Sequence, residues 1–282
     1  MKLIRYGAPG MEKPGIFREG NYYDVSKFFR DYDEAFFEGG GLELLGELDK
    51  EGALKQIMVE RLGCPIKRPS KIVCIGLNYS DHAKETGATP PSEPVIFLKS
   101  TTAIIGPTDA VRIPRGAEKT DWEVELAVVI GKKASYIEKD KAMDYVAGYC
   151  LHNDISERAF QLEMGGTWDK GKGCDTFAPI GPWLVTKDEI DDVHSLRLWL
   201  KLNGHLMQNG STSNLIFDIP TLVAYTSCFM TLLPGDIIST GTPAGVGLGM
   251  KPNLYLKAGD IMELGIDGLG ESRQELIAFD QI

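Results

Sequence analysis

Residues 121–131 have the sequence Asp121-Trp122-Glu123-Val124-Glu125-Leu126-Ala127-Val128-Val129-Ile130-Gly131. The run is apolar, rich in β-branched residues and ends at a glycine, a pattern that predicts a strand. Because successive side chains of a strand point to opposite faces, Glu123, Glu125 and Ala127 share one face. Two like charges this close repel each other unless something neutralises them. A divalent cation with oxygen ligands, Mg, Mn or Ca, would do so, and a solvated strand face is the alternative.

Further short strands are predicted on both sides of this segment. Asn203-Gly204 is the strongest hairpin signal, because a type I′ turn needs positive φ at both central residues. Helices are predicted over 138–146 and 222–230, the second after Asp218 and Pro220. The expected strands are 2–6, 16–25, 71–76, 95–99, 122–131, 180–185, 196–202, 236–241 and 261–266. Strands and helices do not alternate, so we expect a β-rich α+β protein and not a doubly wound parallel sheet.

The sequence changes character near residue 65, where Cys64-Pro65-Ile66-Lys67-Arg68-Pro69-Ser70 contains two prolines and two cations. We therefore expect a small N-terminal domain over residues 1–68 and a catalytic domain over residues 69–282. Forty acidic residues against thirty basic ones give a net charge of −10, without a polybasic block. A nucleic acid or an anionic membrane is therefore not an expected partner, because both need Lys and Arg to neutralise phosphate.

The five cysteines are an odd number and form no C-x-x-C pair. This spacing fits neither a disulfide framework nor a thiolate zinc site, so we expect reduced thiols. The opening residues show no apolar stretch followed by a small-residue cleavage site, and no run of about 18 apolar residues occurs. We therefore expect a cytoplasmic protein.

A third acid, Asp154, follows the apolar, strand-like segment 145–151. The common role of an aspartate between a strand and a helix is that of an N-cap. Together with Glu123 and Glu125, however, Asp154 would complete the few carboxylates that Mg takes from a protein, leaving positions for water or substrate.

His82 and Glu85 are three residues apart, so they are neighbours on one face if their segment is helical. A carboxylate beside an imidazole orients it and raises its basicity, which suits general-base activation of water. A surface ion pair is the alternative. The segment follows a bend at Gly76, so it could also be a mobile lid.

Two glycine-rich segments carry further candidates. Lys172 lies in the glycine-flanked segment 169–175, where little bulk would shield its ammonium from a ligand, although solvated loop lysines are common. The segment 240–247 lacks both the Walker lysine and the dinucleotide fingerprint. It would either line a substrate site or form an ordinary tight turn.

A set of motifs between residues 70 and 279 resembles the fumarylacetoacetate hydrolase family. The motifs are Ile75-Gly76-Leu77-Asn78-Tyr79-x-x-His82, Phe97-Leu98-Lys99, Glu123-x-Glu125-Leu126-Ala127, Asn153-Asp154-x-x-x-Arg158, Lys172-Gly173-x-Asp175, Pro179-x-Gly181-Pro182 and Ser239-Thr240-Gly241-Thr242-Pro243-x-Gly245-Val246-Gly247. The opening Arg5-Tyr6-Gly7 and Glu12-Lys13-Pro14-Gly15 resemble a subgroup often labelled ureidoglycolate lyase, and also hydrolases of 2,4-diketo-3-deoxy sugar acids.

The resemblance implies rolled mixed β-sheets around a Mg or Mn site, usually in a homodimer. The implied metal ligands are Glu123, Glu125 and Asp154.

Other residues match catalytic and binding positions of the family. His82 and Glu85 match its water-activating pair, and Lys172 matches the lysine that contacts the substrate oxyanion. The residues that match substrate-binding positions are Lys99, Arg158, Gln161 and Thr242.

The sequence thus predicts a metal-dependent hydrolase that cleaves a carbon–carbon bond in a 2,4-diketo acid. The substrate would be an acylpyruvate or a 2,4-diketo-3-deoxy sugar acid, and the products pyruvate and a carboxylic acid. A decarboxylase, an isomerase or a ureidoglycolate lyase would use the same metal–enolate chemistry, but a hydrolase has the greatest need of a water-activating pair. A metal-stabilised binding protein without catalytic activity is a third hypothesis.

Overall fold

The predicted central strand is β11 (Val124–Ile130), which lies in the middle of an eleven-stranded mixed sheet. In this computed structural model, which describes residues 1–87 and 89–281, β11 pairs antiparallel with β12 (Val146–Asn153) and with β18 (Ile237–Ser239). Every residue of β11 and β12 is buried. The alternative of a solvated strand face is therefore wrong, because both faces of β11 are covered.

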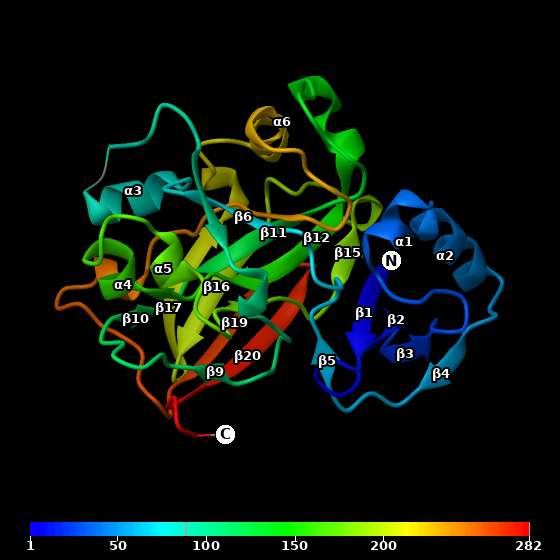
Figure 1. The fold of residues 1–282 in the computed structure, drawn as a ribbon, viewed down its shortest axis with the longest axis horizontal. Coiled ribbons are helices and arrows are strands. Elements are labelled where there is room, and N and C mark those ends of the chain that lie inside the picture. Colours follow the sequence, from blue (N-terminus) through cyan, green and yellow to red (C-terminus); the bar gives the residue numbers. More distant parts are fainter. Residues whose placement is uncertain (88, 282) are drawn as a thin grey trace.

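The first strands of the chain extend this same sheet, with β1 pairing antiparallel with β15 (Figure 1). The remaining strands of the sheet are β1 (Lys2–Tyr6), β2 (Lys13–Arg18), β3 (Asn21–Asp24), β4 (Lys55–Ile57), β5 (Leu62–Gly63), β6 (Ile72–Gly76), β7 (Val95–Lys99) and β15 (Leu184–Thr186). Two helices, α1 (Glu34–Glu38) and α2 (Gly41–Lys50), lie beside β1–β4 at one end of the molecule. The domain boundary after residue 68 stays a prediction.

A second sheet packs against β11 through two of its strands, β16 and β19. Its order is β17 (His205–Ser211), β16 (Arg197–Leu202), β19 (Ile261–Ile266), β20 (Gly270–Ile277) and β9 (Val111–Arg112). The hairpin prediction is confirmed, since Asn203 and Gly204 between β16 and β17 have φ of 50° and 80°. Two small sheets pair β10 (Thr120–Asp121) with β13 (Ser156–Glu157) and β8 (Ile104–Ile105) with β14 (Ala178–Pro179).

The helix α6 (Ile219–Phe229) begins where the sequence predicts it, because the Asp218 side chain accepts a hydrogen bond from the Thr221 N–H at 2.9 Å. The helix expected over 138–146 is present, but it is of the 3₁₀ type and not an α-helix. This segment is the 3₁₀ helix η2 (Lys139–Tyr145). The Glu138 side chain does not cap it, and the Lys141 N–H donates to the Glu138 carbonyl, which is the i→i+3 hydrogen bond of a 3₁₀ helix. The other helices are α3 (Ser80–Thr86), α4 (Arg158–Leu162), α5 (Asp169–Lys172), η1 (Thr101–Ala103), η3 (Lys187–Glu189), η4 (Thr212–Asn214) and η5 (Gly247–Gly249).

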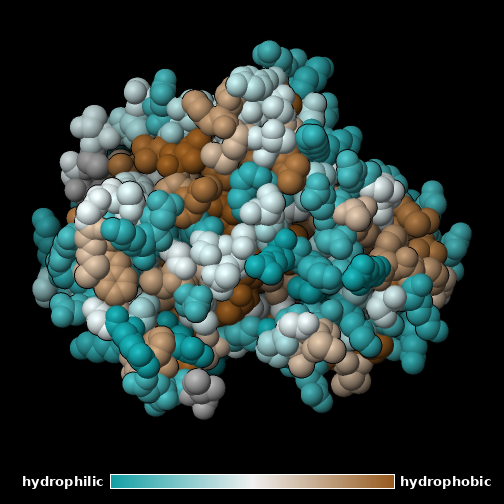
Figure 2. All heavy atoms as spheres, viewed as in Figure 1, coloured by the Kyte–Doolittle hydropathy of each residue, from teal (hydrophilic) through white to brown (hydrophobic). Residues whose placement is uncertain are grey.

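The predicted β-rich α+β class with mixed sheets is confirmed, and in the described residues the sheets are open and do not close into a barrel. One face of the molecule is mainly hydrophilic, with apolar side chains gathered between α3 and α6 (Figure 2). None of the helices in the described part of the chain has the length and apolar character needed to cross a bilayer.

Candidate active site

Three carboxylates meet at the centre of the large sheet. Glu123 directly precedes β11, Glu125 lies on it, and Asp154 directly follows the paired strand β12. The Asp154 N–H donates to the Glu123 carbonyl at 2.9 Å, which fixes the two strand ends against each other. One oxygen atom from each carboxylate lies within 4.8 Å of the other two, and all three side chains are buried. Asp154 is not a helix N-cap, because α4 is capped by Glu157.

Cations surround two of these carboxylates. Lys172 Nζ donates to Glu123 Oε2 at 2.6 Å and to Asp154 Oδ2 at 2.9 Å. Lys99 Nζ donates to Asp154 Oδ1 at 2.6 Å, and Arg158 lies 2.7 Å from Glu123 Oε1. Burial alone would raise the pKa of Glu123 and of Asp154, but these positive charges lower both below their ordinary values. The two carboxylates are therefore ionised.

Glu125 has different partners. Its Oε2 accepts hydrogen bonds from Ser239 Oγ at 2.5 Å and from the Gly241 N–H at 3.0 Å. Its Oε1 accepts none from residues 1–87 or 89–281. Burial, followed by the negative charges of Asp154 and Glu123, raises the pKa of Glu125 well above its ordinary value.

This donor set fits a divalent metal ion. The candidate ligand atoms are all carboxylate oxygens, and a cation placed among them would relieve their mutual repulsion. Hard cations such as Mg²⁺ and Mn²⁺ prefer oxygen ligands of this kind.

A buried histidine that sequence analysis did not single out supports Glu125. His152 Nδ1 lies 2.6 Å from Ser239 Oγ. Because the Ser239 hydroxyl donates to Glu125, it accepts from His152. Burial lowers the pKa of His152 to about 3, so the ring is neutral. His152 thus fixes the orientation of the hydroxyl that holds Glu125.

The predicted pair His82 and Glu85 lies on α3, with Nδ1 and Oε2 separated by 3.5 Å. The backbone N–H of Gly245 donates to both Glu85 oxygens at 3.0 Å. Burial raises the pKa of Glu85, but the contact with His82 and the hydrogen bonds from the Gly245 N–H outweigh burial and lower that pKa below its ordinary value. Glu85 is therefore ionised and positioned to hold the imidazole.

A cavity of 190 Å³ lies between α3 and the acidic cluster. The predicted site residues that line it are His82, Glu123, Glu125, Arg158, Gln161, Lys172 and Thr242. Glu85, Lys99 and Asp154 are not among its lining residues in the described part of the chain. Lys99 lies behind Asp154, and its Nζ also donates to the Ile155 carbonyl at 3.0 Å. Its contacts are therefore with Asp154 and not with the cavity.

Lys172 differs from the solvated loop lysine that its glycine-flanked sequence suggested. It ends the short helix α5 and is 2% exposed. Gly171 serves close packing here, since a Cβ at this position would lie 2.4 Å from the Glu157 carbonyl oxygen. Burial alone would lower the pKa of Lys172, but Asp154 and Glu123 raise it above its ordinary value. Lys172 is therefore positively charged beside these two carboxylates.

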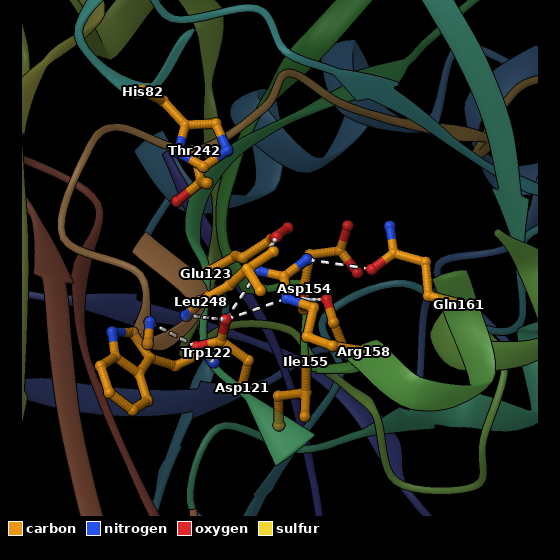
Figure 3. Close-up of polar contacts among 12 residues, drawn as sticks. His82, Asp121, Trp122, Glu123, Asp154, Ile155, Arg158, Gln161, Thr242 and Leu248 are labelled. Atoms are coloured by element: carbon orange, nitrogen blue, oxygen red, sulfur yellow. Dashed lines mark hydrogen bonds and ion pairs between the residues drawn. The ribbon is translucent and has the colours of Figure 1, made fainter. Parts of the chain in front are cut away.

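Asp121 is a site residue that sequence analysis missed. Its Oδ1 accepts from the Gly247 N–H at 2.7 Å, and its Oδ2 accepts from the Leu248 N–H at 3.0 Å and from Arg158 Nε at 2.9 Å. Figure 3 shows Arg158 held between this carboxylate and Gln161, while His82 stands apart from the cluster. The only signal was an acid at the start of an apolar strand, because its partners lie far away in the sequence.

Residues 71–277 match the family described as "Fumarylacetoacetate (FAA) hydrolase C-terminal", and the chain belongs to this family. A relative from Burkholderia multivorans, whose name is "Putative hydrolase", is 53% identical over 97% of this chain and 98% of its own. The structure of fumarylacetoacetate hydrolase from Exiguobacterium antarcticum is similar with a TM-score of 0.86, 32% identity and 99% coverage of both chains.

Two further similar structures carry different activity names. Maleylpyruvate hydrolase from Sphingobium sp. SYK-6, in complex with manganese(II) and pyruvate, has a TM-score of 0.82 and 29% identity, with 99% of both chains covered. The 5-carboxymethyl-2-hydroxymuconate delta-isomerase from Mycobacterium smegmatis has a TM-score of 0.79 and 33% identity, with 100% of both chains covered. The family is one of enzymes, and its similar members include a hydrolase and an isomerase.

Proposed function

We propose that this protein is a hydrolase that uses Mg²⁺ or Mn²⁺ to cleave a carbon–carbon bond in a 2,4-diketo acid, giving pyruvate and a carboxylic acid. The observation that carries the proposal is that one cavity is lined both by carboxylates of the acidic cluster and by His82. The manganese and pyruvate bound to the similar maleylpyruvate hydrolase support it.

The polar end of the cavity would hold the pyruvate half of the substrate. Glu123, Glu125 and Asp154 would hold the metal, which supplies Lewis-acid polarisation of the 2-keto group when bound. An ammonium has three N–H donors, and Lys172 uses two of them on Glu123 and Asp154. Its third N–H is available to the oxygen at C2.

His82 would act as the general base. It takes a proton from water as the water oxygen bonds to C4, while ionised Glu85 stabilises the imidazolium that forms. The C3–C4 bond then breaks, and its electron pair forms the enolate of pyruvate. Lys172 stabilises the enolate oxygen through its fixed positive charge. The proton taken up by His82 balances the proton that C3 needs to give pyruvate.

The experiment is mass-spectrometric identification of products with Mg²⁺, with and without EDTA. The substrates are acylpyruvates, 2,4-diketo-3-deoxy sugar acids, oxaloacetate and ureidoglycolate. We expect EDTA-sensitive formation of pyruvate and an acid from a diketo compound. The Glu123→Gln variant is expected to lose this activity, whereas Glu275→Gln, which removes an exposed carboxylate of β20, is the matched control. Full activity of Glu123→Gln would contradict the proposal.

The second candidate is isomerisation of an unsaturated dioic acid, which the similarity to the delta-isomerase favours. Product analysis separates it, because an isomer has the mass of its substrate whereas hydrolysis adds water and gives two acids. Carbon dioxide would instead indicate a decarboxylase, and glyoxylate a ureidoglycolate lyase. A homodimer and a cytoplasmic location stay predictions.

A further inference from the structure

We infer that the cavity takes a diketo acid whose acyl group, beyond C4, is uncharged, and that Trp168 forms the wall against which this group lies. This inference rests on the proposed cleavage of diketo acids and adds the chemistry of the group that the sequence left undefined.

The cavity has a polar end and an apolar end. The pyruvate half must lie beside Glu123, Glu125 and Lys172, because the metal ligands and the enolate-stabilising cation are there. In the proposed pose, the acyl group leaves C4 in the direction away from the carboxylates. The remaining lining includes polar side chains, among them Gln161 and Thr242, and a larger apolar set: Ile75, Leu77, Phe97, Leu162, Trp168 and Leu248.

Phe97 lies between the two ends. Lys172 Nζ lies 5.1 Å from the centre of the Phe97 ring, and the Trp168 ring packs edge-on against the same ring at a centroid distance of 5.3 Å. Trp168 precedes Lys172 by one helical turn, and the Lys172 N–H donates to the Trp168 carbonyl at 3.2 Å. In the proposed pose, α5 and the residue before it therefore place the Lys172 ammonium beside the pyruvate half of the substrate and the Trp168 indole beside the acyl group.

The indole is a fixed surface. A Cβ added at Gly76 would lie 2.4 Å from the Trp168 ring, so the absence of a side chain at Gly76 lets the ring lie directly on the end of β6. The ring is thus held between Gly76 and Phe97. A large, rigid aromatic side chain offers apolar contact area at little cost in conformational entropy.

Among the residues that the structure describes, the lining offers no cation without a carboxylate partner to receive a second carboxylate. Its cations are Lys172 and Arg158. Lys172 is paired with metal ligands, and Arg158 lies 2.9 Å from Asp121 Oδ2 and 2.7 Å from Glu123 Oε1. A carboxylate packed against the Phe97 and Trp168 rings would lose water on that side without gaining a cationic partner from the described lining, which is costly.

Two further lysines, on elements that neighbour the cavity, line different hollows. Lys170 Nζ donates to the Met164 carbonyl at 2.7 Å, and its side chain lines a separate groove together with Cys174. Lys84 lines a hollow on the other side of Leu248. Neither lines the cavity among the residues that the structure describes.

The test compares two diketo acids that are nearly isosteric: succinylpyruvate and the analogue in which an isopropyl group replaces its terminal carboxylate. With Mg²⁺ present, we expect kcat/KM to be higher by at least about tenfold for the isopropyl compound. Equal values, or a preference for succinylpyruvate, would overturn the inference.

Binding is measured separately with the corresponding 2-oxo acids that lack the 4-keto group and cannot be cleaved. Titration calorimetry with Mg²⁺ is expected to show the same preference. If no diketo acid is cleaved but the binding preference is found, the proposed function fails and the apolar subsite stands. If cleavage occurs without a preference in kcat/KM or in binding, the hydrolase stands and this inference fails.

Variants locate the subsite. Trp168→Ala is expected to raise KM for the isopropyl substrate by about tenfold and to change KM for acetylpyruvate much less, while Trp168→Phe restores most of the loss. Equal losses for both substrates would overturn the role of Trp168.

Leu162→Lys is expected to strengthen binding of the dicarboxylate ligand, whereas Leu206→Lys is not. Leu162 and Leu206 are 50% and 51% exposed, but Leu162 alone of the two lines the cavity.

Discussion

The acidic cluster and the His82–Glu85 pair of the candidate site are held by different structural elements. Glu125 lies on β11, which is fully buried and hydrogen-bonded to strands on both sides. His82 and Glu85 lie on the seven-residue helix α3, which Tyr79 precedes without a side-chain cap. The proposed metal ligands are thus preorganised by the core, whereas the proposed base is carried by a short surface element. We therefore propose that metal binding and proton transfer can be separated by substitution.

The largest effects on Mn²⁺ binding and on activity are expected from one substitution in the acidic cluster and one at His82. Glu123→Gln should abolish Mn²⁺ binding and activity together, because it removes a charged metal ligand. His82→Ala should lower kcat by roughly 10²–10⁴-fold, the usual contribution of a general base, and leave Mn²⁺ affinity unchanged. Titration calorimetry with Mn²⁺ and steady-state kinetics measure the two properties. Equal loss of Mn²⁺ affinity in both variants would refute the separation.

A smaller effect on metal affinity and activity is expected at Asp121, which contacts Glu123 only through Arg158. Asp121→Asn removes the charge that fixes Arg158 beside Glu123, so we expect a loss of roughly 10–100-fold in metal affinity or activity. The matched control is Asp109→Asn, which breaks the ion pair with Arg61 at 2.6 Å, outside the cavity. If both variants bind Mn²⁺ and react like the parent, Asp121 has no positioning role.

The smallest effect concerns the attachment of α3. The lowered pKa of Glu85 means that its contribution to stability is present above its ordinary pKa of 4.5 and is lost as pH falls through the folded-state value below it. Amide hydrogen exchange of α3 should therefore accelerate relative to β11 at acidic pH, and Glu85→Gln should reduce this pH dependence. A pH dependence of α3 that persists in Glu85→Gln would show that Glu85 does not anchor the helix.

The acidic cluster was predictable because it follows from local rules. The period of two along residues 123–127 places Glu123 and Glu125 on one face, and Asp154 directly follows another apolar, strand-like segment. Resemblance to the family then implied all three as ligands. Asn203-Gly204 fixed its hairpin for an equally local reason, since both residues adopt positive φ.

The parts that could not be predicted depend on distant partners. Asp121 accepts hydrogen bonds from Gly247 and Leu248, residues that only the folded sheet brings near it. Lys172 is buried because two carboxylates, one before β11 and one after β12, form ion pairs with its ammonium, and a glycine-flanked sequence does not reveal these partners. Lys99 faces Asp154 and not the cavity for the same reason.

The central claim is that water, activated beside a bound metal, cleaves the bond next to C4. The most direct measurement is mass spectrometry of the products formed from an acylpyruvate in oxygen-18 water with Mg²⁺. The account predicts pyruvate and a carboxylic acid that has gained oxygen-18 from the solvent, formed only with metal and greatly reduced in His82→Ala. A product that retains all the carbon of the substrate, or carbon dioxide in place of an acid, would contradict it.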